Sequence, residues 1–228
     1  MKLLAIDTTE TACSVALALD GDAIWRHRVA PRQHSELVLP MAAELLEEAG
    51  LPLSRLDAIA FSRGPGSFTG VRIATAVAQG LALGADLPLV PVSTLLSLAQ
   101  GAFREAGAAH VLAALDARMG ELYWAAVEVG DEGPRLLSEE RVAPPPRVTA
   151  PGRDDWVAVG SGWDAHLEAL MPRFRPVRVL HGWQIHARDV AAVGAVERAR
   201  GGGVPPERAL PVYLRNEVAK KSAVQPLE

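Results

Sequence analysis

The residues best suited to chemistry lie in a glycine-rich stretch, Ser62-Arg63-Gly64-Pro65-Gly66-Ser67-Phe68-Thr69-Gly70. An apolar run precedes it and an alanine-rich run follows it, which predicts a strand, a tight loop and a helix. Gly64 and Gly66 permit positive φ and close backbone approach, and Ser67 or Thr69 can cap the helix. Free amides and the helix dipole would favour a phosphate there. Without a Walker lysine, the stretch is equally compatible with a turn that only packs a helix onto a sheet.

A second polar stretch, Asp7-Thr8-Thr9, follows the short apolar run Leu3 to Ile6. A carboxylate and hydroxyls at the end of a strand can hold a phosphate or a metal ion, although such a turn is more often an ordinary polar hairpin. The candidate phosphate-binding residues are therefore Asp7, Thr8, Thr9, Gly64, Gly66, Ser67 and Thr69. No catalytic residue and no metal ligand is predicted.

Neither histidine nor cysteine indicates a site of its own. The six histidines form no convincing metal-binding pair: His27, His34, His110, His166, His181 and His186. Cys13 is the single cysteine, so no disulfide can form within the chain. It lies in an apolar run, which predicts a buried, inert thiol.

Composition predicts a globular cytoplasmic protein. The chain has 228 residues, 49% of them hydrophobic, which is enough for two modest domains or one large one. Met1 and Lys2 lead into an apolar strand and then a charged residue, unlike a signal peptide, and no uninterrupted apolar segment reaches the roughly 18 residues that cross a bilayer. The net charge of −4 argues against a free-standing nucleic-acid-binding protein, so any RNA contact would depend on a partner.

The elements that must position these residues begin with a three-stranded meander that turns at Asp20-Gly21-Asp22. Its strands are Leu3 to Ile6, Cys13 to Leu19 and Ala23 to Val29. The predicted order of the first half is β-β-β-α-β-α-β-α. After the three strands come helix Leu37 to Ala49, the strand before the glycine loop, helix Phe68 to Gly84, strand Leu87 to Val92 and helix Leu95 to about Arg104.

A second unit starts with the strand Val111 to Leu115, which reaches Asp116 and is paired by Glu121 to Val129. This hairpin repeats the first one, with Asp116 at the place of Asp7. A strand Trp156 to Val159, a short helix up to Leu170, a helix His186 to Arg200 and an extended segment Pro211 to Arg215 follow. We expect an α/β fold with two domains, residues 1–106 and residues 107–228, each a mixed sheet flanked by helices, the second domain being the smaller in ordered content.

Two helices have the composition of an interface. The helix Leu37 to Ala49 is apolar on two faces, and the helix Phe68 to Gly84 repeats Gly or Ala at every fourth residue. Together they could offer a flat surface to a partner, or they could be covered by the second half of the chain. The interface residues predicted on them are Leu37, Met41, Leu45, Gly70, Ala74 and Ala78.

The strand order and the two polar loops together resemble the actin, hexokinase and sugar-kinase superfamily, whose two ribonuclease-H-like halves close over ATP. More narrowly, five motifs are similar to those of the TsaB family of bacterial tRNA threonylcarbamoyladenosine synthesis. They are Ile6-Asp7-Thr8, Gln33-His34-Ser35-Glu36, Gly64 to Arg72, Asp116-Ala117-Arg118 with Gly120-Glu121 and Tyr123, and Pro211-Val212-Tyr213-Leu214-Arg215.

This resemblance implies a cytoplasmic, non-catalytic subunit without independent enzymatic activity. Its partners would be the catalytic paralogue TsaD and the ATPase TsaE, with tRNA bound only through the complex and a homodimer formed when the chain is alone. The complex modifies the adenosine next to the anticodon of tRNAs that read ANN codons. ATP or ADP is expected to bind weakly or at the interface with a partner, and no membrane is involved.

One departure from the paralogue bears on mechanism. The paralogue holds a metal ion with two histidines four residues apart, at the helix start that here reads Ser93-Thr94-Leu95-Leu96-Ser97-Leu98. Thr94 and Leu98 supply no imidazole, and leucine cannot ligate a metal. The rival hypotheses are an independent small-molecule kinase or ATPase, with Gly160-Ser161-Gly162 as its second phosphate loop, and a peptidase with Cys13 or Ser67 as nucleophile.

Overall fold

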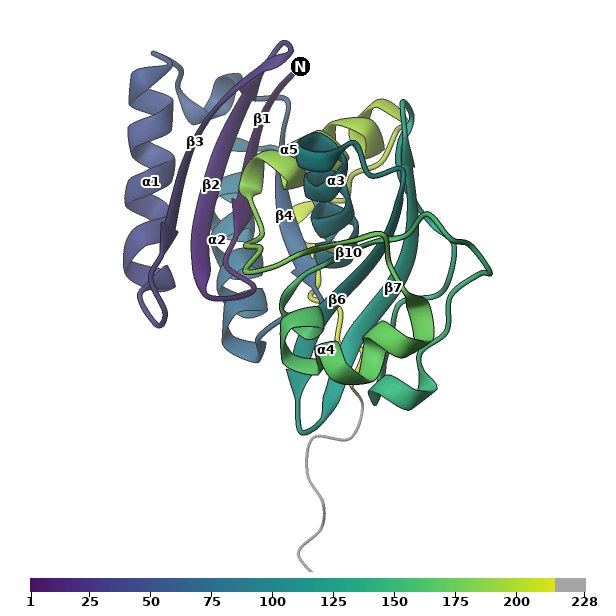
Figure 1. The fold of residues 1–228 in the computed structure, drawn as a ribbon. Helices are drawn as coiled ribbons and strands as arrows, with labels where there is room; N and C mark the ends of the chain where they lie inside the picture. The colour runs from purple at the N-terminus through teal and green to yellow at the C-terminus, as the bar shows by residue number, and fades with distance from the viewer. Residues whose placement is uncertain (216–228) are drawn as a thin grey trace, which may run out of the picture.

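The computed structural model describes residues 1–215; residues 216–228, which the predicted second domain includes, lie outside the described part. Two sheets lie side by side, with helices between and around them (Figure 1). The first sheet has the strand order β3-β2-β1-β4-β5. Its strands are β1 (Lys2–Asp7), β2 (Ala12–Leu19), β3 (Asp22–Val29), β4 (Ala58–Gly64) and β5 (Leu89–Ser93).

The second sheet has the order β11-β10-β6-β7-β8, and β9 pairs with β7. Its strands are β6 (His110–Arg118), β7 (Glu121–Gly130), β8 (Gly133–Leu136), β9 (Arg141–Ala143), β10 (Val157–Val159) and β11 (Arg178–Leu180). The strands β8, β9 and β11 were not predicted, because each contains an arginine and none is a continuous apolar run like the equally short β10.

The two sheets have the same topology. In the first, β1 pairs antiparallel with β2 and parallel with β4, and β4 pairs parallel with β5. In the second, β6 pairs antiparallel with β7 and parallel with β10, and β10 pairs parallel with β11. The equivalence that the sequence predicted for the two opening hairpins therefore extends to five strands. As predicted, the fold is α/β with two related halves.

The last helix of each half packs on the sheet of the other half. Helix α3 (Thr94–Ala106) follows β5, yet its buried face packs on β6, β7 and β10 of the second sheet. Helix α5 (Ala187–Ala199) follows β11 and packs on β1, β2, β4 and β5 of the first sheet. Both helices lie between the sheets (Figure 1). We propose a domain division between residues 106 and 107. It separates the two sheets, but each sheet is then covered in part by a helix of the other domain.

The outer face of the first sheet is covered by α1 (His34–Glu48) and α2 (Phe68–Ala85). Ala74, Ala78 and Ala82 are fully buried there, because small side chains let α2 approach the sheet closely. Of the predicted interface residues, Leu37 is half-buried, whereas Met41, Leu45, Gly70, Ala74 and Ala78 belong to the core of this chain. The outward positions of the same helices are different residues, among them Leu39, Ala76, Gly80 and Leu83.

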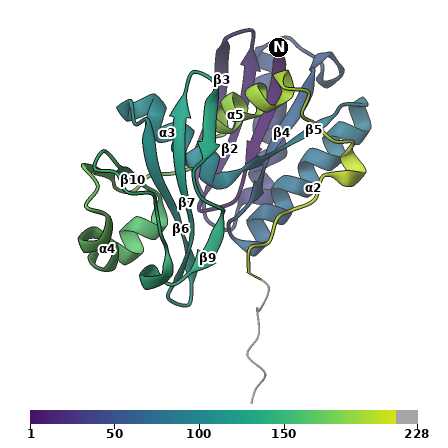
Figure 2. The same ribbon diagram turned by 90° about the vertical axis from the view of Figure 1, so that its right-hand side faces the viewer.

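Helix α2 is, by length and composition, apolar enough to span a membrane. The buried alanines account for that composition, because they form the contact between α2 and the sheet. Its side chain Gln79 also donates to the carbonyl oxygens of Pro206 and Ala209, each at 3.0 Å, which ties α2 to the C-terminal segment. Figure 2 shows that segment running past α2. These contacts fix one face of α2 against the first sheet and the C-terminal segment, and 33% of the helix is buried.

The other elements are short. Helix α4 (Ser161–Phe174) packs on the far face of the second sheet, around Trp124 and Trp163. Single 3₁₀ turns form at η1 (Leu53–Arg55), η2 (Pro145–Arg147) and η3 (Pro206–Arg208). After η3 the chain forms no helix or strand through Arg215.

Candidate functional site

The turn after β1 and the glycine loop after β4 are bound to each other. The Thr8 hydroxyl donates to the carbonyl oxygen of Gly70 at 2.6 Å, and the amide of Ser67 donates to the carbonyl oxygen of Thr9 at 2.7 Å. The Ser67 hydroxyl caps α2 by accepting from the amide of Gly70 at 3.2 Å, whereas Thr69 is exposed. The structure thus brings together the residues that the sequence singled out, and Ser67 is the cap.

The glycines of this loop make room for protein atoms. A Cβ on Gly66 would lie 2.7 Å from Thr9 Cβ, and one on Gly70 would lie 2.0 Å from the Thr8 carbonyl oxygen. Gly64 has a φ of +106°, and a Cβ there would meet the Val212 carbonyl oxygen at 2.8 Å. This geometry favours the interpretation that the glycines pack the loop against its neighbours, because the amide of Ser67, a predicted phosphate-binding residue, already has a partner, as does the amide of Gly70.

Asp7 lies fully buried at the carboxyl end of β1. Its carboxylate accepts from the Thr9 amide at 3.2 Å and from the Thr9 hydroxyl at 2.9 Å. Burial raises the pKa of this carboxyl above its usual range, and the hydrogen bonds from Thr9 oppose that effect. The side chain is therefore held by the turn itself.

A cavity of about 670 Å³ opens beside this turn, between the two halves. The first half contributes the residues around Thr9 and Ser67, and the hairpin of β6 and β7 contributes Asp116 and Tyr123. Its volume falls in the range of roughly 300–1,000 Å³ that is usual for ligand sites. The lining residues are Thr9, Glu10, Thr11, Pro65, Gly66, Ser67, Phe68, Val71, Arg72, Leu115, Asp116, Ala117, Arg118, Tyr123, Val212, Tyr213 and Arg215.

The C-terminal segment forms one wall of the cavity. The amide of Val212 donates to the Arg63 carbonyl oxygen at 2.8 Å, and Arg72 donates to the Tyr213 hydroxyl at 2.9 Å. Arg215 crosses to the second half, where it donates to Glu121 at 2.6 Å and to the carbonyl oxygen of Arg118 at 3.3 Å. The last described residues therefore connect the two halves across the cavity.

Glu10 also connects the halves, and sequence reasoning missed it. The Ser161 hydroxyl donates to Glu10 Oε1 at 2.5 Å and accepts from the Asp116 amide at 3.0 Å. Burial, assisted by the charges of Asp7 and Asp116, raises the pKa of Glu10 to about 7, against the opposing effects of the Ser161 hydrogen bond and Arg118. Of this contact, the sequence indicated only the loop Gly160-Ser161-Gly162. A single acidic residue in a turn, such as Glu10, belongs to no recognisable motif.

Glu10→Gln is expected to make the protein more stable at pH 8 by about 1–3 kcal/mol and to leave it unchanged at pH 4. Between pH 4.5 and 7 the unfolded chain loses the Glu10 proton while the folded chain keeps it, so the stability of the native protein falls as pH rises. Glutamine has no such proton, and its amide oxygen can still accept from Ser161. Urea unfolding of both proteins across this pH range measures the difference; parallel curves would contradict the raised pKa.

Neither proposed nucleophile has the surroundings of one. Burial raises the pKa of Cys13 to about 12, so the thiolate is suppressed. The Ser67 hydroxyl is occupied as the cap of α2. The pair Thr94 and Leu98 offers no metal site either, because leucine has no donor atom and Leu98 is fully buried in the core of the second sheet. Within residues 1–215, no group of three or more His, Cys, Asp or Glu residues could hold a metal ion.

Comparison with known proteins identifies the family. A family model described as "TsaD: tRNA N6-adenosine threonylcarbamoyltransferase" matches residues 27–210. The Escherichia coli (strain K12) "tRNA threonylcarbamoyladenosine biosynthesis protein TsaB" is 43% identical over 225 residues, which cover 97% of each chain. The chain belongs to the TsaB family. The Haemophilus influenzae protein of the same name is 37% identical over 230 residues, covering 97% of this chain and 96% of its own.

A solved structure gives the same result. "YeaZ from Pseudomonas aeruginosa" superposes with a TM-score of 0.89 at 49% sequence identity, covering 93% of this chain and 99% of that one. The resemblance inferred from five sequence motifs is thereby confirmed, and so is the α/β fold with two related halves. Three of these five motifs line the cavity described above: the glycine loop, the Asp116 motif and the C-terminal segment.

Proposed function

We propose that this chain is a non-catalytic subunit of tRNA threonylcarbamoyladenosine biosynthesis. It would bind and activate a catalytic paralogue of the TsaD type, together with the ATPase TsaE, in the cytoplasm. Membership of the TsaB family supports the pathway, because the relatives that span almost the whole chain carry that function in their names. Contact with tRNA would occur in the complex, as the net charge of −4 suggests for the chain alone.

The start of α3 is the observation that carries the non-catalytic assignment. Thr94 and Leu98 occupy the places of the paralogue's two histidines, and both side chains are fully buried. Leu98 packs among Leu95, Ala99 and the second sheet, so this helix start serves the core of the chain. A subunit that keeps the fold but lacks the metal-binding donors is suited to support a catalyst.

The outer faces of α1 and α2 are the surface we assign to the paralogue, and to a second copy when the paralogue is absent. Leu39 and Leu83 are 48% and 65% exposed there, and Ala76 and Gly80 lie on the same outward side of α2. A Cβ on Gly80 would find no atom within 4 Å, so another helix could approach closely. An apolar, small-residue surface of this kind is typical of a docking site.

Gly80→Arg is expected to weaken association with the TsaD-type paralogue at least about 100-fold, because a long charged side chain would stand in the contact. The melting temperature of the isolated chain should stay within a few degrees, since the position is open and arginine favours a helix. Analytical ultracentrifugation with and without the paralogue, and thermal unfolding, measure both quantities.

The control is Val177→Arg, at a position 67% exposed on the second half, which should leave association unchanged. The buried Ala78→Arg should instead destabilise the fold itself. Full association of the Gly80→Arg variant would show that the paralogue binds elsewhere. Tight ATP binding with turnover by the pure chain would favour the alternative of an independent kinase or ATPase.

A further inference from the structure

Three of the five motifs that define the resemblance converge on the cavity between the halves. They are the glycine loop with the start of α2, the tip of the hairpin of β6 and β7, and the C-terminal segment Pro211 to Arg215. The contacts among them explain how the halves are joined. They do not explain why large apolar and cationic side chains stay exposed at the mouth of the cavity.

Two aromatic rings and an arginine cluster at one side of this mouth. Phe68 is 55% exposed and Tyr213 is 44% exposed, and their ring centroids lie 5.9 Å apart. The Arg72 guanidinium lies 3.5 Å from the Phe68 ring centroid and donates to the Tyr213 hydroxyl. Among residues 1–215, Arg72 forms no ion pair with a carboxylate. Its charge is therefore available to an external anion.

The hairpin tip supplies the opposite side. The Arg118 side chain is 83% exposed, and although it pairs with Asp116 at 3.0 Å, an exposed pair of this kind is weak. Met119 at the tip is 76% exposed, and Arg215 lies next to it, with its guanidinium 3.8 Å from the Met119 sulfur. Flat rings and guanidinium groups thus surround the entrance.

The interior is apolar at its walls and carries carboxyl groups. Val71, Leu115 and Ala117 supply apolar surface, whereas Glu10 and Asp116 supply acceptor oxygens. Carboxyl groups at this depth would repel an acidic peptide. They would accept hydrogen bonds from the amino groups of a nucleobase, while the arginines at the mouth would attract its phosphate.

We propose that this cavity binds one unpaired nucleotide of the substrate tRNA, with its base inside and its phosphate at Arg72 and Arg118. Single-stranded RNA is recognised by stacking bases on aromatic rings and guanidinium planes and by hydrogen bonds to the base edges, which these residues supply. The inference rests on the proposed function and deepens it, because it assigns this subunit a direct contact with the RNA.

The test uses the complex of this chain with the TsaD-type paralogue and a fluorescent anticodon stem-loop of a tRNA that reads an ANN codon. Phe68→Ala should weaken binding at least about fivefold through loss of stacking. Arg118→Ala should reduce the slope of log K against log salt by about 1, as expected for one lost phosphate contact. The matched controls, Val177→Ala and Arg135→Ala, change exposed residues outside the cavity and should have no effect.

A second measurement locates the contact directly. Photo-crosslinking with a stem-loop that carries a photoreactive base should label the peptides that contain Phe68, Tyr123 or Tyr213. Normal complex formation with unchanged affinity, salt slope and labelling would overturn this inference and leave the proposed function intact. Protection of the cavity by the paralogue in the absence of RNA would also overturn it, by assigning the cavity to a protein segment. Failure of the complex to form would instead contradict the proposed function.

Discussion

Replacing Gly70 by alanine is expected to lower the free energy of unfolding by about 3 kcal/mol or more, the largest effect we expect from one added methyl group. The new Cβ would lie 2.0 Å from the Thr8 carbonyl oxygen and 2.5 Å from the Ser67 hydroxyl oxygen. Neither atom can move without cost, because one is backbone at the end of β1 and the other caps α2. Urea unfolding followed by circular dichroism measures the loss.

The same helix supplies a matched control. Gly80→Ala adds the same methyl group at a position where nothing lies within 4 Å of the new Cβ. Alanine is a better helix former than glycine, so this variant should be more stable than the native chain by roughly 0.5–1 kcal/mol. If both variants were equally stable, the contact between the glycine loop and the turn after β1 would not exist in solution.

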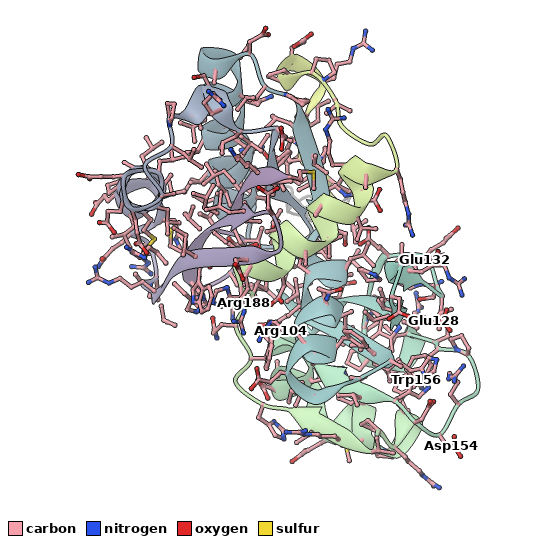
Figure 3. The ribbon with its side chains drawn as sticks, turned by 90° about the horizontal axis from the view of Figure 1, so that it is seen from above. Arg104, Glu128, Glu132, Asp154, Trp156 and Arg188 are labelled. Carbon is pink, nitrogen blue, oxygen red and sulfur yellow. The ribbon has the colours of Figure 1, made fainter. Side chains whose placement is uncertain are left out.

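Asp189→Ala is expected to destabilise the protein by about 2–4 kcal/mol, because it removes the buried carboxylate that pairs with Arg104 and leaves this partly buried arginine only the exposed Glu105. Asp189 on α5 is 1% exposed, and its two carboxylate oxygens accept from Arg104 on α3 at 2.8 and 3.1 Å. Burial raises the pKa of Asp189, and Arg104 opposes this. Figure 3 looks down on this junction and labels Arg104. Urea unfolding again measures the change.

An exposed ion pair provides the comparison. Glu48→Gln removes the carboxylate that Arg26 contacts at 2.6 Å, where the two side chains are 47% and 37% exposed. This change should have little effect on the unfolding midpoint, since exposed pairs add little stability. An equally small effect of Asp189→Ala would show that the ion pair does not hold the exchanged helices α3 and α5 together.

Local sequence patterns determined the order of elements in the first half and the opening hairpin of the second. Short apolar runs mark β1 and β2, the Asp20-Gly21 turn joins β2 to β3, and the glycine loop separates β4 from α2. Such signals depend on residues that are neighbours along the chain. The five motifs were likewise sufficient to identify the family, because residue types at fixed spacing can be recognised without any knowledge of tertiary contacts.

Only the tertiary structure decided which surfaces these elements bury. The repeat of small residues on α2 predicted close packing, but the packing partner of Ala74 and Ala78 is the first sheet, while Ala76 and Gly80 face outward. Similarly, the sequence placed α5 in the second half, although its apolar face covers the first sheet. Periodicity identifies an apolar face and cannot name the surface it meets, since that surface is distant in sequence.

The candidate site depends on such distant contacts most of all. Glu10 and Ser161 are 151 positions apart, and Arg72 and Tyr213 are 141 apart, so no local pattern could have joined them. The sequence supplied the motifs around Gly66 and Asp116 one by one. The cavity exists because two sheets of equal topology place their hairpin ends opposite each other and the C-terminal segment crosses between them. That placement follows from packing of the two halves, which is a property of the whole chain.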